Sequence, residues 1–226
     1  MKLSDIKIEA LKLMFITGAE VLSLDNLEAY AYDENYGFYL VKMNGSINRC
    51  FSRLEAMGVL PPRVHTLRAE DARELAEVLE YDLTDIPISE LVDVVFVDNS
   101  TWLDKSTGLE KSTWQRRKLC ADEYEHIPEE NLLLLNKIGE EDRYKVYYRP
   151  KINRLTDVSG NNTEIDIPDT VASLIPLYIK SELYQEDEPG AAAEARNLFE
   201  AQLLEIKDSE ERKSEPVRSV YSLADM

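Results

Sequence analysis

The side chains in this sequence that are most able to do chemistry are its carboxylates. Asp82, Asp85 and Asp93 stand close together in the chain, and two or more carboxylates that converge on one divalent cation are the usual basis of metal-dependent hydrolysis. The chain has 44 acidic residues, however, so close spacing of this kind arises by chance. No EF-hand loop is present. A metal-dependent hydrolase is therefore an alternative hypothesis and not the leading one.

Other groups that could act in catalysis stand alone in the sequence. His65 and His126 are the only imidazoles, and neither has a His or Cys neighbour at the spacing of a metal site. Cys50 falls on an apolar stripe, which favours a buried core thiol, and Cys120 is distant from it in the chain. The isolated glycines form no phosphate-binding loop, and no GxSxG motif supports a serine nucleophile. We therefore predict that the protein is not an enzyme and holds no metal or cofactor.

Composition and charge are those of a soluble globular protein. The chain has 226 residues, of which 44% are apolar and 31% are charged, and its net charge is −18. This acidic excess argues against a nucleic-acid clamp, because phosphate binding needs clustered Lys and Arg. No apolar run is long enough to span a bilayer and the N-terminus is not a secretory signal, so we expect no membrane contact and synthesis in a cytosol. Solubility is the simplest interpretation of the charge.

Residues 1–63 are predicted to be helical. The predicted helices are one with Ile8, Leu11 and Phe15 on its apolar face, a short one over Leu24–Tyr32 and one over Ile47–Met57. Asn44 and Gly45 indicate a turn before the last of these helices, and Ser46 is its predicted N-cap.

Residues 64–167 are predicted to form an antiparallel β-rich module. Leu91–Val97 is apolar and rich in β-branched residues, which indicates a buried strand. Leu132–Asn136 and Tyr144–Tyr148 flank a polar turn, the pattern of a β-hairpin. Further strand candidates are Arg117–Tyr124 and Ile165–Ile167, and Ala69–Glu80 has the periodicity of a helix.

Residues 168–206 are predicted to form an antiparallel pair of helices. Apolar residues recur at helical spacing at Val171, Leu174, Ile175, Tyr178, Ile179 and Leu183, and then at Ala192, Ala195, Phe199, Leu203 and Ile206. The acidic turn between them is short, so the two helices must lie side by side. Pro176 kinks the first helix if that helix begins at Asp169, and lies in its first turn if Ser173 is the N-cap.

Neither helix of this pair can bury its apolar face alone, so we expect the pair to pack on residues 1–63. The fold class that follows is α+β: a helical bundle formed by both ends of the chain, with the antiparallel β-rich module inserted between them. Residues 207–226 are charged and are predicted to be a flexible tail.

Two stretches of the sequence resemble known proteins. The string that runs from Ile167-Pro168-Asp169 through Leu174-Ile175-Pro176-Leu177-Tyr178-Ile179 and Glu182-Leu183-Tyr184 to Glu188-Pro189 and Ala191-Ala192 resembles the C-terminal helical hairpin of head–tail connector (adaptor, or head-completion) proteins of tailed bacteriophages. Met43-Asn44-Gly45-Ser46-Ile47-Asn48-Arg49 is similar to the second helix of such proteins in phages of Gram-positive bacteria. Both motifs consist of apolar periodicity and turn residues, without a catalytic signature.

This resemblance implies a structural virion protein that joins the portal of the phage head to the tail, as a ring of about twelve copies around the DNA exit channel. The implied partners are the portal protein, other copies of the chain and downstream neck or tail proteins, while DNA passes through the lumen without specific binding. The implied location is the virion neck, and the host cytoplasm during assembly. A tail-completion or other virion structural protein is the alternative. Related connectors can be smaller and all-helical, so the β-rich module departs from the simplest pattern.

The first group of candidate interface residues lies in and after a polar segment, Asn99–Trp114, which is predicted to be a long loop. Trp102 and Trp114 in this loop are either interface anchors or rings that fold back on the module. Arg116 and Arg117 belong to the only basic cluster, and we expect them to meet an acidic neighbour, such as another copy of the chain, rather than single-stranded nucleic acid.

The second group lies in the predicted tail. Val217, Val220 and Tyr221 form a short apolar patch there. We expect this patch to become ordered when the tail docks on the portal, because a segment that is free in isolation gains its order on binding.

Overall fold

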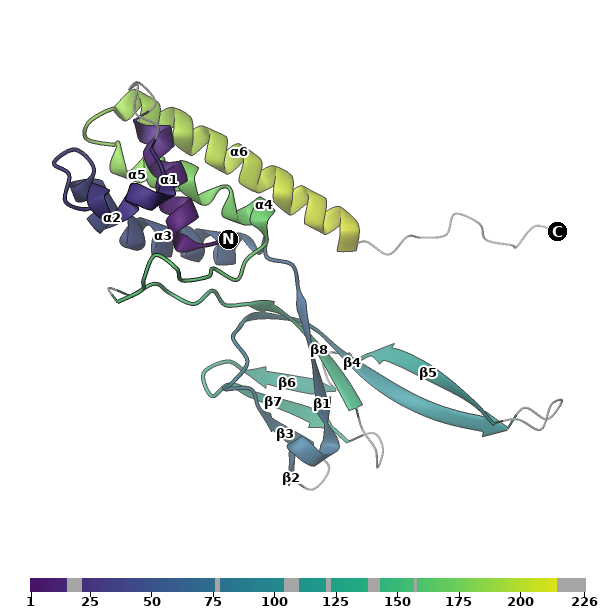
Figure 1. The fold of residues 1–226 in the computed structure, drawn as a ribbon. Coiled ribbons are helices and arrows are strands. Elements are labelled where there is room, and N and C mark those ends of the chain that lie inside the picture. The colour runs from purple at the N-terminus through teal and green to yellow at the C-terminus, as the bar shows by residue number, and fades with distance from the viewer. Residues whose placement is uncertain are drawn as a thin grey trace, which may run out of the picture. The chain divides into compact units, whose positions relative to one another are not determined.

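The structure, a computed structural model, describes residues 1–15, 22–75, 78–103, 110–120, 123–137, 143–156 and 158–214. The chain divides into two compact units, which Figure 1 shows as a ribbon. The first unit consists of Met1–Leu60 and of the chain from Ile152 onward, and the second consists of Pro61–Lys151. The first unit is helical and the second is built of antiparallel strands, so the predicted α+β class is confirmed.

The helical unit combines helices from both ends of the sequence. Its elements are α1 (Leu3–Met14), a 3₁₀ turn (Leu24–Asn26), α2 (Leu27–Tyr30), α3 (Gly37–Met57), α4 (Asp169–Ala172), α5 (Ile175–Leu183) and α6 (Pro189–Ser214). Helix α5 contacts α1, α3 and α6. The C-terminal helix pair therefore packs on the N-terminal helices through α5.

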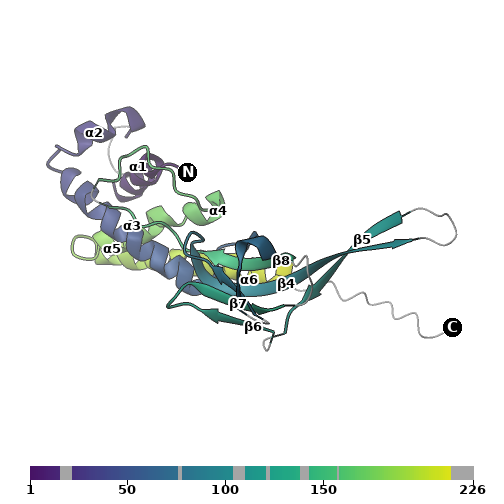
Figure 2. The ribbon, with the colours of Figure 1, turned by 90° about the horizontal axis from the view of Figure 1, so that it is seen from below.

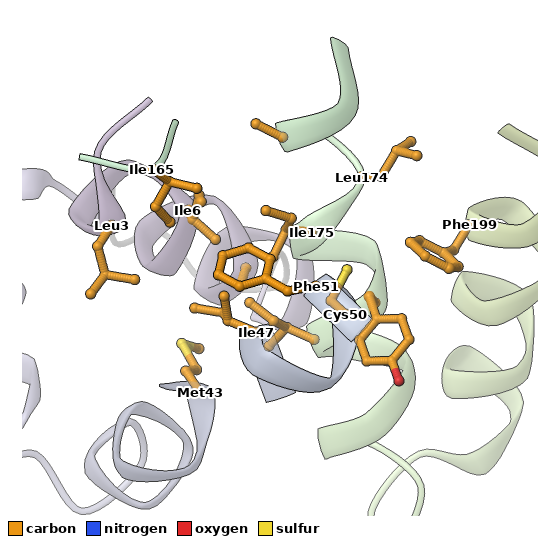
Figure 3. Packing of buried hydrophobic residues seen from close by; sticks show 14 of the residues in the cluster. Leu3, Ile6, Met43, Ile47, Cys50, Phe51, Ile165, Leu174, Ile175 and Phe199 are labelled. Carbon is orange, nitrogen blue, oxygen red and sulfur yellow. The ribbon is translucent and has the colours of Figure 1, made fainter. Parts of the chain in front are cut away.

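The core of this unit is a single apolar cluster, part of which is shown in Figure 3. Phe51 of α3, Ile175 of α5 and Phe199 of α6 are all fully buried in it. The rings of Tyr178 and Phe199 meet edge to face, with their centroids 5.1 Å apart. Burial of such side chains stabilises a fold by about 1.5–3 kcal/mol each, so the two sequence ends depend on each other for stability.

Two side chains of the α5 region bind the end of α1. The ammonium of Lys180 donates to the carbonyl of Leu13 over 2.8 Å, and the hydroxyl of Tyr184 donates to the carbonyl of Met14. Both carbonyls belong to the last turn of α1, where the helix itself offers no donors. These contacts fix the C-terminal end of α1 against the helix pair.

Residues 152–167 belong to the helical unit, although we assigned them to the β-rich module. The buried apolar residues of this segment are Ile152, Leu155, Ile165 and Ile167. The segment also binds the N-terminus, since the N–H of Leu3 donates to the carbonyl of Thr163. The strand predicted at Ile165–Ile167 is wrong, because its backbone is committed to these contacts and forms no ladder.

Helix α3 is continuous over 21 residues, so the turn predicted at Asn44 and Gly45 is wrong. Met43 and Ser46, on either side of the predicted turn, are fully buried. Burial of this face outweighs the poor helix propensity of glycine, which is about 1 kcal/mol relative to alanine. Ser46 therefore lies inside the helix and is not its N-cap. The helix ends at Gly58, whose φ of 64° is a left-handed conformation that glycine adopts without strain.

Pro176 lies in the first turn of α5. Helix α4 has already ended at Ala172, so the proline interrupts no hydrogen bond in a helix interior. The prediction that Pro176 lies in a first helical turn, and does not kink a helix that begins at Asp169, is therefore confirmed. The N-cap residue differs, since it is Leu174 and not Ser173.

Helix α6 is longer than the sequence pattern predicts. It has 26 residues and runs to Ser214, so the prediction of a flexible tail is wrong over residues 207–214. Residues 215–226 lie outside the described part of the chain. Leu203 is the last fully buried residue among the described side chains of α6, so the end of the helix continues past the core of its unit.

The strand unit contains two four-stranded antiparallel sheets. Its elements are β1 (Arg63–Arg68), a 3₁₀ turn (Ala69–Asp71), β2 (Arg73–Leu75), β3 (Val78–Asp82), β4 (Ile88–Leu103), β5 (Glu110–Lys118), β6 (Tyr124–Ile127), β7 (Leu132–Asn136) and β8 (Arg143–Pro150). The strand orders are β1-β8-β4-β5 and β2-β3-β7-β6. Both sheets contribute side chains to one core, where the rings of Tyr81 and Tyr144 lie 6.3 Å apart.

The β-hairpin predicted from Leu132–Asn136 and Tyr144–Tyr148 is wrong. Both segments are strands, β7 and β8, but β7 pairs with β3 and β6, whereas β8 pairs with β1 and β4. Each strand buries alternate residues in the shared core, for example Leu133 in β7 and Val146 in β8. That pattern specifies which face is buried and not which strand lies beside it.

The helix predicted over Ala69–Glu80 is also wrong. The segment holds the second 3₁₀ turn, β2 and the beginning of β3. In β3 the buried residues Leu79 and Tyr81 alternate with more exposed ones, which is the period of a strand.

Candidate interaction surfaces

The hairpin formed by β4 and β5 extends beyond its sheet. Strand β4 pairs with β8 as far as Phe96, and with β5 from Val95 to Leu103. Past Phe96, β5 is therefore the one strand beside β4 in the described part of the sheet. We call residues 97–103 and 110–116 the ribbon; Figures 1 and 2 show it leaving the other strands of its unit.

The ribbon corrects the prediction of a long loop over Asn99–Trp114. Both ends of that segment are paired strand, with Asn99 opposite Trp114 and Trp102 opposite Lys111. Residues 104–109, between the two strands, lie outside the described part of the chain. Polar residues such as Asn99, Ser100 and Ser112 interrupt any apolar alternation, so the sequence pattern did not indicate strands here.

The register separates the four candidate interface residues of this region into two pairs. Residues directly opposite each other share a face of an antiparallel ribbon, and successive residues alternate between its faces. Trp102 and Arg117, which lies one residue beyond the ribbon, therefore take positions on one face, which we call the Trp102 face; Trp114 and Arg116 take positions on the other, the Trp114 face. The Trp102 face also includes Lys111, which the sequence pattern did not single out.

The three tail residues predicted to dock on the portal, Val217, Val220 and Tyr221, lie outside the described residues. The helix that precedes them, α6, is described as far as Ser214. The outer side of α6 carries exposed residues at spacings of four, three, four and three: Glu194, Leu198, Ala201, Glu205 and Asp208. Residues at this spacing lie on one helix face. We call these five residues the α6 strip.

The α6 strip combines apolar and acidic side chains. Leu198 is 46% exposed, and Leu204, beside the strip, is 51% exposed. The three charged residues of the strip are all acidic. Leu198 and Leu204 are six residues apart, so they lie on different sides of the helix, and the strip itself has one exposed leucine. The sequence alone could have suggested this strip from its spacing, but a helix of this length was not predicted.

Ion pairs hold α6 in a fixed position on its unit. Arg53 of α3 donates to Glu200 over 2.8 Å, and Arg196 lies 3.4 Å from the same carboxylate. The guanidinium of Arg196 also lies 4.8 Å from the centre of the Tyr178 ring. The hydrogen bond to Glu200 raises the pKa of Arg53, so this arginine stays protonated. These contacts bind α6 to α3 and to α5.

A smaller exposed apolar group lies at the start of α3. Phe38 and Val41 are 56% and 81% exposed and are three residues apart, so they share a helix face. The ammonium of Lys42 lies 3.7 Å from the centre of the Phe38 ring. The sequence pattern left this segment unassigned, because its apolar residues surround the helix.

Two of the three candidate carboxylates, Asp82 and Asp93, make contacts within the strand unit. Asp82 accepts hydrogen bonds from the N–H and hydroxyl of Thr84, which lowers the pKa of Asp82. Asp93 pairs with Lys118 over 2.8 Å. Within the described ranges, no group of three or more His, Cys, Asp or Glu side chains could hold a metal ion.

One histidine and one cysteine, His126 and Cys50, are shifted in pKa by burial. His126 lines a cavity of about 390 Å³ in the strand unit, and burial lowers the pKa of this imidazole. In the same cavity the Glu90 carboxylate pairs with Arg149. Burial also raises the pKa of the Cys50 thiol, so the reactive thiolate is disfavoured.

Two further observations bear on the class of protein. Among the helices that the structure describes, none is both long and apolar enough to cross a membrane. No protein-family model matches the chain, and no curated protein matches it.

Proposed function

We propose that this chain is a structural subunit of a tailed-phage virion, which joins the portal of the head to the tail as a ring around the DNA exit channel. The observation that supports this most directly is the ion pair between Arg49 and Glu182. Arg49 belongs to the first stretch that resembles connector proteins, and Glu182 belongs to the second. The two stretches that carry the resemblance therefore contact each other within one helical unit.

The charge of the chain supports passage of DNA through such a ring. The chain has a net charge of −18, and a ring of such acidic subunits would repel the phosphates of DNA and bind them weakly. DNA therefore slides through the lumen without specific binding. The proposed partners are the portal, neighbouring copies and downstream neck or tail proteins, and the proposed location is the virion neck, with assembly in the host cytoplasm.

Reconstitution with the portal tests this proposal. The full chain is mixed with the portal ring from the same phage genome, and native mass spectrometry measures the complex. A ring of the chain bound to the portal is the expected result. If the chain remains separate from the portal at all mixing ratios, the proposal is rejected.

A truncation after Ser214 tests the role of the tail patch, because it keeps all of α6 and removes Val217, Val220 and Tyr221. We expect the truncated chain to melt at the same temperature as the full chain and to lose portal binding. Unchanged portal binding would reject the docking role of these three residues.

The alternative, a tail-completion or other virion structural protein, differs in position on the particle. Gold-labelled antibody against the chain distinguishes the two in electron micrographs of virions. Label at the neck supports the proposed connector. Label at the tail tip would assign the chain to tail completion instead.

A further inference from the structure

We infer that two copies of this chain bind each other through their helical units, with Phe38 of each copy inserted into a cavity between α5 and α6 of the other. Phe38 and the cavity belong to one compact unit, so the inference needs nothing from the strand unit. It concerns the free chain before any ring forms, so it can fail while the portal proposal stands.

The first argument is an open cavity between α5 and α6. Its volume is about 480 Å³, within the range of about 300–1,000 Å³ in which proteins hold ligands. The residues that line it include Tyr178 and Glu182 of α5 and Pro189, Ala192, Ala193 and Arg196 of α6. The guanidinium of Arg196 lies 4.8 Å from the centre of the Tyr178 ring. An aromatic side chain suits this cavity, because it packs on the alanines and its face attracts a guanidinium.

The second argument is the charge around the cavity. The sequence from Glu182 to Glu194, which leads from α5 into α6, has five acidic residues and no basic one. Glu186, Glu188 and Glu194 are exposed, and none of the three makes an ion pair with a residue that the structure describes. The group that fits the cavity and its surroundings is therefore apolar, with a positive charge beside it.

The start of α3 offers this combination. Phe38 and Val41 are both exposed on one face of the helix. The ammonium of Lys42 lies 3.7 Å from the centre of the Phe38 ring, and no carboxylate in the described part of the chain pairs with it. From Gly37 to Arg49, α3 has two basic residues and no acidic one. An aromatic ring with a cation beside it is thus the chemical complement of the cavity.

The start of α3 and the cavity border each other within one copy. Tyr39, next to Phe38, donates to Asp187 over 2.6 Å, and Arg49 of α3 binds Glu182, which lines the cavity. Two copies related by a two-fold axis can therefore make the contact twice, once in each direction. A dimer that joined two α3 faces or two cavities would bring like charges together, which is unfavourable. The exchange of Phe38 between copies is the arrangement in which opposite charges meet.

Sedimentation velocity of the full chain, without the portal, tests for the dimer. We expect the mass of a dimer at high protein concentration and of a monomer on dilution. Phe38→Glu is expected to raise the dissociation constant at least about thirtyfold, since it replaces an aromatic anchor by a carboxylate that faces acidic residues. A monomer at every concentration would overturn the inference.

Leu204→Glu is the matched control for this variant. It makes the same change of charge at a leucine that is 51% exposed, compared with 56% for Phe38. Leu204 lies eight residues beyond Arg196 along α6, about 12 Å past the last residue of the helix that lines the cavity. We expect the dissociation constant to stay unchanged. Equal effects of Phe38→Glu and Leu204→Glu would overturn the inference.

Filling the cavity tests the other half of the contact. Ala193 is exposed at the cavity, so Ala193→Trp is expected to fold and to lose the dimer. Ala201→Trp, at an exposed alanine eight residues further along α6, is expected to keep the dimer. Circular dichroism melts check that both variants are folded. A folded Ala193→Trp that retains the dimer would overturn the assignment of the cavity.

Mixing the two disabled variants tests the direction of the contact. The intact Phe38 of Ala193→Trp can enter the intact cavity of Phe38→Glu, so we expect a heterodimer where neither variant dimerises alone. One variant is labelled with heavy nitrogen, and a carbodiimide joins Lys42 of one copy to an acidic residue of 186–194 of the other. Mass spectrometry identifies the joined peptides and their source.

Absence of a joined peptide pair with mixed labels would overturn the inference. If the chain alone is always a monomer and Ala193→Trp abolishes portal binding, the cavity belongs to the portal contact and not to self-association.

Discussion

The guanidinium of Arg49 binds both carboxylate oxygens of Glu182, although 132 residues separate the two in the chain. Its Nε lies 3.1 Å from Oε1 and its Nη2 lies 2.6 Å from Oε2. This hydrogen-bonded geometry raises the pKa of Arg49, and it joins the middle of α3 to α5. Two-point contacts of this kind fix orientation as well as distance.

The change Glu182→Gln is expected to lower the free energy of unfolding of the helical unit by about 1 kcal/mol, because it removes a two-point ion pair whose carboxylate is mostly buried. Urea denaturation followed by circular dichroism measures the loss. Glu9→Gln is the control, since Glu9 pairs with Lys12 on the exposed surface of α1 and its loss is expected to cost under about 0.5 kcal/mol. Equal losses would show that the geometry around Glu182 adds nothing.

The change Gly45→Ala is expected to raise the free energy of unfolding by about 0.5–1 kcal/mol, since Gly45 lies inside α3 and alanine is the better helix former. A Cβ at this position would meet only the Arg49 guanidinium at 3.5 Å, an ordinary contact distance. Gly58→Ala is the contrasting variant, and we expect it to destabilise the chain because the φ of Gly58 is 64°. Destabilisation by Gly45→Ala would indicate a turn at that point.

The change Phe199→Ala is expected to destabilise the helical unit by about 3–5 kcal/mol, because Phe199 is fully buried against Tyr178 and its loss leaves a cavity. The neighbouring residue is the control: Leu198 is 46% exposed, and Leu198→Ala is expected to change stability by under about 0.5 kcal/mol. Thermal melts of the two variants measure the difference. Similar melting temperatures would place α6 away from the core.

Alkaline pH is expected to destabilise the helical unit through Tyr39. The hydroxyl of Tyr39 donates to Asp187 over 2.6 Å, and this hydrogen bond, followed by burial, raises the pKa of Tyr39 to about 12. The pKa in the unfolded chain is lower, about 10. The contribution of the raised pKa is therefore fully present below pH 10 and is lost as the pH rises from about 10 to about 12.

The variant Tyr39→Phe removes this titration and keeps the ring. We expect it to be less stable than the parent at neutral pH and to lose less stability than the parent between pH 9 and 11. Urea midpoints across this range measure the difference. A parallel pH dependence in both proteins would assign the alkaline loss to other groups.

The sequence by itself determined the type of the elements whose local pattern is strong. The apolar residues of α5 and α6 recur at helical spacing, and Leu91–Val97 and Leu132–Asn136 are short apolar runs, so each local pattern indicates its element. The same local pattern could not fix the ends of elements. Burial of Met43 and Ser46 carries α3 through Asn44 and Gly45, against their local turn preference.

Only the tertiary structure decided which elements lie together. The pairing of β7 with β3 and β6, the Arg49–Glu182 contact and the position of Trp102 on the face opposite Trp114 all depend on register between segments distant in the chain. Periodicity specifies that a face is buried but not which partner buries it, because many partners of similar apolarity satisfy the same pattern. Side-chain packing over the whole unit makes that choice.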